Sequence, residues 1–369
     1  MSTSFSSVPL EPTNEDSQPL FETTIKTSLP RRRAYLMRLF RPTRALETRS
    51  REQSYVHCSS MSLSSKLSQR LAYHVRNVDL NSLSRIPQAR LGERALPNVG
   101  LIEFVSAEDF AKLYDALYIS MFPHQAERER SDLITDRLQQ EFAGQRRNLG
   151  PYRVIGIRDH DGKAIGAAQF SVLLLPGRQY AVPYLQYLYV RVESRRQDMA
   201  EVLHTMVLAV ATADAEAHDN RSVPFTLFET EPAGHGEDGA SQAVATQRAM
   251  IHTKAGAVAI MLRRESDGAT SSPHVQPGLE IDDPPLSLVW AIRRSPAMVA
   301  QVFNVDVRNI GEDLIAAYYQ SLRDEGFPEP NIRLAESIVT DRCRDHNFVL
   351  MALGEVVLHK DSLCNLDKH

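Results

Sequence analysis

The sequence has few cysteines and no long apolar run. Its 369 residues include three cysteines, Cys58, Cys343 and Cys364. Three scattered cysteines cannot form the disulfide framework of a small secreted domain, and they favour a reducing compartment. No window approaches the roughly 20 consecutive apolar residues of a membrane-spanning helix. We therefore expect a cytoplasmic protein without a membrane span, with export or targeting by its N-terminal segment as the alternative.

Several familiar motifs are also absent. The sequence has no Walker loop and no Gly-x-Ser-x-Gly nucleophile elbow. The glycine-rich run 234–239 contains His, Glu and Asp, and we interpret it as a flexible loop near the acceptor side and not as a phosphate cradle. Cys343, His346, His359 and Cys364 have a spacing that imitates a zinc site. However, the segment 347–358 between the two pairs is typical of packed structure. We therefore expect no metal.

Charge is unevenly distributed along the chain. Residues 1–95 carry 15 Lys and Arg against 8 Asp and Glu, whereas the remainder carries 27 against 38. An acidic body is a poor candidate for non-specific nucleic-acid binding and a better one for a cationic or amine partner. We expect no nucleic-acid partner, and the sequence leaves the oligomeric state open.

Composition and periodicity divide the chain into three parts. Residues 1–95 are rich in Ser and Arg with weak periodicity, which predicts a basic, disordered arm. Residues 96–294 alternate strand and helix patterns in the order β-α-α-β-β-β-α-β-α-β-β. Residues 295–369 read as a mainly helical extension, although 347–359 is either a strand or a buried helix. The expected fold class is α/β (α+β): a mixed, mostly antiparallel sheet flanked by helices.

One turn in this pattern has the character of an anion site. The stretch 190–204, VRVESRRQDMAEVLH, joins a predicted strand to an amphipathic helix. Backbone N–H groups at a helix N-terminus bind phosphate, and glycine lets the backbone approach closely. Asp198 brings a negative charge there instead, and its carboxylate can satisfy those N–H groups itself. Arg195 and Arg196 offset that charge, with Arg191 as a further cation.

Together, the element order and this turn resemble the GNAT superfamily of acyl-CoA-dependent N-acyltransferases over residues 100–294. Members carry Arg/Gln-x-x-Gly-x-Gly/Ala after their fourth strand. Here the six residues are Arg195, Arg196, Gln197, Asp198, Met199 and Ala200. Asp198 departs from the central glycine of the family pattern. The resemblance implies that this segment holds the pyrophosphate of acetyl-CoA, and that the backbone of Leu188, Tyr189 and Val190 lies beside the pantetheine arm.

The resemblance also implies catalytic residues. Glu229 and Glu231, on the strand that diverges from the fourth one in family members, are the candidates for deprotonating the acceptor amine. Because they alternate with Thr230, we expect both on one side of the strand. His252 stands near the place where family members carry a tyrosine that protonates the CoA thiolate, and an imidazolium can serve as that acid.

The resulting hypothesis is an N-acetyltransferase that acts on an amine of a small molecule or peptide. The alternative is a catalytically degenerate GNAT-fold protein that binds a ligand or partner. Asp198 and the missing tyrosine favour that alternative.

Overall fold

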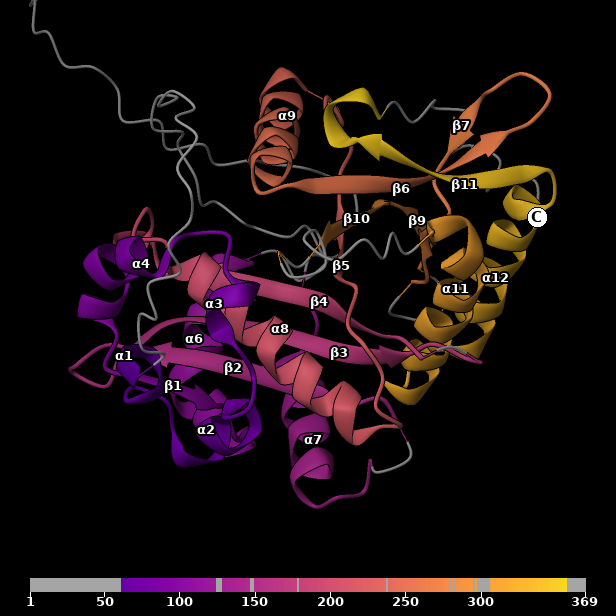
Figure 1. Ribbon diagram of the computed structural model, residues 1–369. Helices are drawn as coiled ribbons and strands as arrows, with labels where there is room; N and C mark the ends of the chain where they lie inside the picture. The colour runs from indigo at the N-terminus through magenta and orange to yellow at the C-terminus, as the bar shows by residue number, and fades with distance from the viewer. Residues whose placement is uncertain are drawn as a thin grey trace, which may run out of the picture.

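The computed structural model describes residues 61–356 except 124–127, 147–148, 178, 237, 279–280, 282, 295 and 297–305 (Figure 1). Residues 1–60 of the expected arm, His359 and Cys364 lie outside the described residues. No helix within these ranges is long and apolar enough to span a membrane.

A nine-stranded sheet forms the centre of the described structure, in the order β1-β2-β3-β4-β5-β10-β6-β11, with β7 paired to β6. Neighbouring strands are antiparallel except β4 and β5, which are parallel. The strands are β1 (Leu101–Phe104), β2 (Tyr152–Arg158), β3 (Ala164–Leu174), β4 (Ala181–Val190), β5 (Phe225–Thr230), β6 (Ala257–Arg264), β7 (Thr270–Ser271), β10 (Val289–Arg294) and β11 (His346–Ala352). A small separate sheet pairs β8 (Val275–Gln276) with β9 (Leu286–Ser287). The expected fold class, a mixed and mostly antiparallel sheet flanked by helices, is confirmed.

The helices agree with the sequence pattern where that pattern is strong. The longest, α8, covers the apolar three- and four-residue spacing after Asp198. Helix α9 begins with a capping box at Asp238 and ends before Gly256, whose φ of 80° is the left-handed conformation that glycine commonly adopts after a helix. The helices are α1 (Met61–Ser64), α2 (Gln69–Val75), α3 (Leu80–Leu83), α4 (Gln88–Arg94), α5 (Ala107–Asp109), α6 (Asp115–Met121), α7 (Ser131–Phe142), α8 (Met199–Ala217), α9 (Gly239–Lys254), α11 (Val307–Asp324) and α12 (Glu329–Cys343). A π-helical turn, Phe110–Tyr114, joins α5 to α6.

Both faces of the sheet are covered, because successive side chains of a strand point to opposite faces. On β10, Ala291 packs with α8 residues, whereas Trp290 and Ile292 pack with α11 and α12. Helices α1–α4, α8 and α9 therefore cover one face. On the other face, α6 and α7 cover the β2–β4 region, and α11 and α12 cover the β5–β11 region (Figure 1).

The N-terminal part differs from the expected boundary at residue 95. Within the described residues, helices are present from Met61 onward, and the apolar residues of α2–α4 are buried in the same core as α8. Leu67 also forms a bridge to Ile102 of β1. Each of these helices is at most seven residues long, so the sequence offers no sustained 3.6-residue period to detect. Residues 61–95 thus form part of the folded core.

The C-terminal extension is built into the sheet as well. The segment 347–359, for which the sequence left strand and buried helix open, contributes most of β11 (His346–Ala352), which pairs antiparallel with β6. Gly311 of α11 lies flat against the ring of Phe348, where an added Cβ would come within 2.6 Å of ring atoms. The extension therefore adds the edge strand β11 to the sheet, and its helices α11 and α12 cover the β5–β11 region of one face.

Candidate functional site

The parallel strands β4 and β5 meet at one point and then separate. Their register has a single pair, Tyr184 with Leu227. Beyond it, β4 continues to Val190 and keeps β3 as its partner, with Ala168 opposite Leu188 and Gly166 opposite Val190. Within the described part of the chain, Leu188–Val190 have no strand partner on the β5 side. This edge can accept an extended ligand backbone by strand addition.

The loop that follows β4 adopts glycine-like geometry without glycine. Arg196 has φ of 66° and Asp198 has φ of 59° and ψ of 18°, both left-handed. Asp is among the few residues other than glycine that tolerate this region, so the backbone path survives the substitution. Asp198 is also the N-cap residue of α8, but its side chain makes no capping hydrogen bond.

Because the Asp198 side chain does not cap α8, backbone N–H groups at the start of this helix have no hydrogen-bond acceptor among the described residues. The N–H groups of Gln197, Met199 and Ala200 meet no acceptor among the residues that the structure describes, whereas those of Glu201 and Val202 both reach the carbonyl of Asp198. Met199 and Ala200 are buried. Buried N–H groups normally have a partner, and at a helix N-terminus an anion is the natural one. The geometry suits a phosphate group.

The carboxylate of Asp198 points away from these donors, toward α4. Arg90 donates from Nε to Oδ2 at 2.9 Å and from Nη2 to Oδ1 at 3.1 Å, while Nη1 of Arg94 lies 3.7 Å from Oδ2. Arg94 also donates from Nη2 to the carbonyl of Arg196 at 2.6 Å. The side chain that breaks the glycine pattern is thus neutralised by helix α4.

The arginines of the motif differ in their roles. Arg195 donates from Nε to the Val190 carbonyl at 3.3 Å and contacts the sulfur of Met121, so it holds the loop against β4. Arg191 pairs with Asp159 at 2.8 Å. Arg196 is exposed, and neither a hydrogen bond nor an ion pair engages its guanidinium within the described ranges. Arg196 is therefore the motif cation that remains available to an anion.

Glu229 lies on the opposite face of the sheet, beneath α11, with no exposed surface. Tyr184 of β4 donates its hydroxyl proton to Oε1 of Glu229, and Tyr318 of α11 does so at 3.1 Å. The Nε2 atom of His274 lies 3.0 Å from the same oxygen. His274 is stacked on Trp290 with ring centroids 4.9 Å apart. A carboxylate, an imidazole and two phenols thus meet where β4 and β5 begin to diverge.

Glu231 does not share this environment, and the expectation that both acids face one side was wrong. Strand β5 ends at Thr230, so the alternation of side chains stops before Glu231. Glu231 instead accepts a hydrogen bond from Nη1 of Arg248 on α9 at 2.9 Å, and both side chains are buried. This ion pair joins the end of β5 to α9.

His252 is enclosed between α9 and the sheet. Its ring lies 4.8 Å from that of Phe228, and neither ring nitrogen has a hydrogen-bond partner among the described residues. Burial, with Arg248 and Arg293 nearby, lowers the pKa of His252 to about 3. The imidazole is therefore neutral near pH 7, which does not suit the expected imidazolium proton donor.

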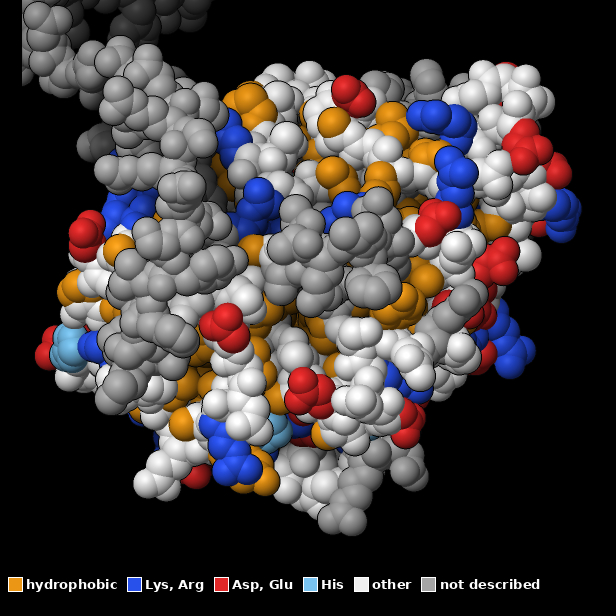
Figure 2. All heavy atoms as spheres, viewed as in Figure 1, with side chains coloured by type: hydrophobic (Ala, Val, Ile, Leu, Met, Phe, Trp, Pro, Cys, Tyr) orange, Lys and Arg blue, Asp and Glu red, His pale blue; other side chains and the backbone are white. Residues whose placement is uncertain are grey.

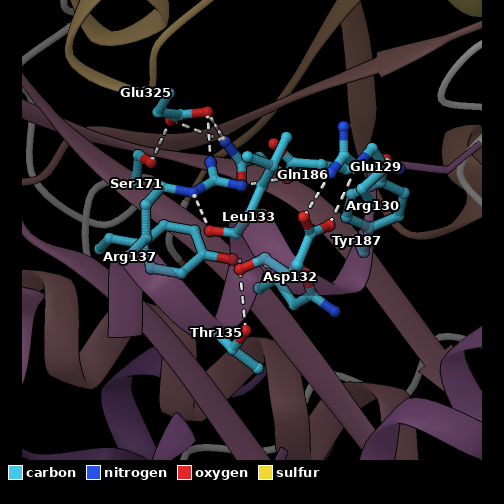
Figure 3. Close-up of polar contacts among 12 residues, drawn as sticks. Glu129, Arg130, Asp132, Leu133, Thr135, Arg137, Ser171, Gln186, Tyr187 and Glu325 are labelled. Atoms are coloured by element: carbon cyan, nitrogen blue, oxygen red, sulfur yellow. Dashed lines mark hydrogen bonds and ion pairs between the residues drawn. The ribbon is translucent and has the colours of Figure 1, made fainter. Parts of the chain in front are cut away.

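A second buried polar network lies beside the diverging strands (Figure 3). The register of β3 and β4 shifts at Gln169 and Phe170, which leaves Gln186 as a bulge residue. Gln186 donates to both carboxylate oxygens of Glu325, at the end of α11, at 2.9 Å. Arg137 of α7 pairs with Glu325 at 2.7 Å and with Glu129. This network fastens the C-terminal extension to α7 and β4.

Leu188, Tyr189 and Val190 are buried, and the Tyr189 ring belongs to an aromatic cluster with Tyr118 and Phe122. Sequence reasoning missed His274, Tyr318, Glu325 and Arg137 as parts of the site. A lone histidine in a polar Ser/Pro/Asp loop carries no periodic signal, and Tyr318 fits an ordinary helix face. Within the described ranges no cluster of three or more His, Cys, Asp or Glu is arranged to hold a metal ion.

Comparisons with known proteins add little. No family model and no curated protein matches the sequence. Among solved structures, the chain is similar to a GCN5-related glucosamine N-acetyltransferase region of a fungal multi-domain GH3 beta-N-acetylglucosaminidase, at 14% identity and a TM-score of 0.30. The match covers 45% of this chain and 18% of that chain. A similarity at this level does not indicate an activity for this chain.

Proposed function

We propose that the chain is a GNAT-type N-acyltransferase that transfers an acetyl group from acetyl-CoA to an amine of a small molecule or peptide. The observation that carries the proposal is the set of open N–H groups at Gln197, Met199 and Ala200, of which the last two belong to buried residues. They begin α8 directly after the unpaired edge of β4. The pyrophosphate would lie on these donors with Arg196 beside it, and the pantetheine arm along Leu188–Val190.

Acetyl-CoA would supply an activated thioester carbonyl, and residues of this chain would remove the proton from the acceptor amine. Residues 191–198, which join β4 to α8, are called the α8 loop. Glu229 and His274 lie on the far face of the sheet from the α8 loop, where β4 and β5 diverge. An imidazole 3.0 Å from a carboxylate can take a proton and be stabilised as imidazolium by that carboxylate. Tyr184 and Tyr318 hold the Glu229 oxygen in place. Glu229 therefore assists deprotonation through His274.

The acceptor would reach a region rich in acidic groups. Glu129, Glu229 and Glu325 are all buried on this face, and Arg137 is the cation that pairs with two of them. Excess negative potential favours a cationic amine over an anionic acceptor. This fits the acidic composition of residues 96–369.

The test is thiol release from acetyl-CoA across a panel of primary amines and polyamines. Glu229→Gln and His274→Asn should each lower kcat about a hundredfold. The matched control, Tyr319→Phe, loses one hydrogen bond to the Val275 carbonyl and leaves the Glu229 contacts intact, so it should keep its activity. Loss of activity in all three variants would instead indicate a packing defect.

A second candidate is a GNAT-fold protein that binds acetyl-CoA or another ligand without turnover. The burial of Glu229, Glu231 and His252 favours it, because each is engaged with or enclosed by protein groups. Tight acetyl-CoA binding without thiol release for any amine would support this candidate over the enzyme.

A further inference from the structure

An arginine-lined hollow lies on the C-terminal part of the molecule, away from the α8 loop. It has a volume of about 550 Å³ and lies between the start of α11 and strand β11. Arg263 of β6, Arg294 of β10 and Arg308 of α11 line it. Figure 2 shows Lys and Arg side chains gathered over the region where Figure 1 places β6, β7 and β11. The volume is typical of a small-molecule site.

These three arginines differ from most of the arginines that the structure describes. None of their guanidinium groups makes a hydrogen bond or ion pair with a residue that the structure describes. By contrast, Arg137, Arg153 and Arg323 each engage two carboxylates. Three unpaired cations around one hollow are an unusual arrangement for a chain with an excess of acids.

Asp306 is the acid in this lining, and it already has a role. Its Oδ1 accepts a hydrogen bond from the backbone N–H of Arg308 at 3.0 Å, which caps α11. Even when its full charge is counted, the hollow keeps an excess of two positive charges. Apolar side chains, among them Phe348 and Leu350, form the rest of the lining.

We propose that this hollow binds a phosphorylated small molecule that carries at least two negative charges. Guanidinium groups match phosphate oxygens in a bidentate geometry, and three of them can grip two phosphate groups from different sides. The apolar part of the lining suits the organic portion of such a ligand. The proposal does not depend on acyl transfer, since none of these residues belongs to the α8 loop or to the Glu229 cluster.

The test is calorimetric titration of the full chain with inorganic pyrophosphate, alone and in the Arg294→Gln/Arg308→Gln double variant. The double variant should weaken binding by at least about tenfold, and added salt should weaken binding in the wild type. The matched control Arg333→Gln, an exposed arginine on α12, should bind as the wild type does. Circular dichroism should show the same melting curve for the wild type, the double variant and the control, because the substituted side chains are exposed or half-buried.

Because pyrophosphate also suits the α8 loop, the titration is repeated in Arg196→Glu. Binding that survives Arg196→Glu and is lost in the double variant assigns the site to the hollow. Sedimentation with phosphatidylcholine vesicles, with and without phosphatidylinositol bisphosphate, separates a lipid headgroup from a free phosphate. Vesicle binding lost in the double variant identifies the headgroup, and binding in solution alone identifies a free ligand. The proposal would be overturned if the wild type bound neither pyrophosphate nor the phosphoinositide vesicles. It would also be overturned if the double variant bound them as well as the wild type does.

Discussion

Arg90 of α4 and Asp198 of the α8 loop, which are 108 residues apart in sequence, form a two-pronged ion pair with contacts of 2.9 and 3.1 Å. Asp198 is 3% exposed, whereas the Arg90 side chain is 40% exposed. The pair turns the carboxylate of Asp198 away from the open N–H groups. Helix α4, which the sequence did not predict, therefore neutralises the charge of Asp198.

This relationship predicts how acetyl-CoA affinity depends on α4. Arg90→Met should weaken binding about tenfold, because the Asp198 charge then repels the phosphates. Adding Asp198→Gly should restore the affinity, since glycine keeps the left-handed backbone and removes the charge. Calorimetry of the single and double variants measures both, with Arg344→Met as an exposed control. A double variant as weak as Arg90→Met would contradict this role of the pair.

Removal of the N-terminal helices should unfold the protein. A chain that begins at residue 96 lacks Leu71, Val75 and Leu91, each buried against the α8 face of the sheet. Each contributes about 1.5–3 kcal/mol of burial, so their combined loss of about 4.5–9 kcal/mol is comparable to the whole stability of a typical domain, about 5–15 kcal/mol. Circular dichroism should show no cooperative melting for this shortened chain. A chain that begins at residue 61 keeps these contacts and should melt cooperatively; cooperative melting of both would refute the prediction.

Stability should fall in mild acid. Burial lowers the pKa of His252 to about 3 and that of His204 well below its usual range. In the unfolded chain both histidines regain a pKa of about 6.5. Below that pH, the unfolded state binds protons that the folded state does not. The free energy of unfolding should therefore decrease as pH falls from about 6.5 toward 3, by ~1.4 kcal/mol per pH unit for each histidine.

Urea denaturation at a series of pH values measures this slope. His204→Leu and His252→Leu should each flatten it between pH values of about 6.5 and 4. His160→Gln removes an exposed histidine and should leave it unchanged. An equal slope in all variants would mean that other groups dominate the acid response.

Arg137 should be essential for stability. It is 3% exposed and pairs with Glu129 and Glu325, both buried (Figure 3). Arg137→Met leaves two carboxylates without a cation and should lower the free energy of unfolding by ~3–5 kcal/mol. Adding Glu325→Gln should recover part of the loss. Arg333→Met, at an exposed position, should change it by less than ~0.5 kcal/mol. A small effect of Arg137→Met would show that the network contributes little.

The sequence predicted most local secondary structure well, but it did not predict contacts between residues that are far apart in the chain. The mostly antiparallel sheet follows from the order of the strand and helix patterns, and helix α8 follows from the amphipathic pattern after Asp198. Helices α1–α4 were missed because each is too short for a period, and β11 stayed ambiguous because a short apolar run fits either state. The proximity of Glu229 and His274 depends on strand pairing and on the packing of α11, neither of which leaves a local signal.

The backbone conformation and the ion-pair partner of Asp198 could not be predicted either, because they too depend on long-range packing. Its charge and its departure from glycine are visible in the sequence, but its left-handed backbone and its partner Arg90 arise from the folded arrangement. Burial, which depends on the whole fold, lowers the pKa of His252, and the sequence alone does not show that burial.

The most direct test of the central claim is calorimetric titration of acetyl-CoA into the full chain and into Arg196→Glu. The wild type should bind in the micromolar range, and the charge reversal at the α8 loop should weaken binding more than about tenfold. Arg344→Glu, an equal charge reversal at an exposed site, should bind as the wild type does. Absence of binding up to millimolar acetyl-CoA, or equal affinity in all three, would contradict the assignment of the α8 loop as the acyl-CoA site.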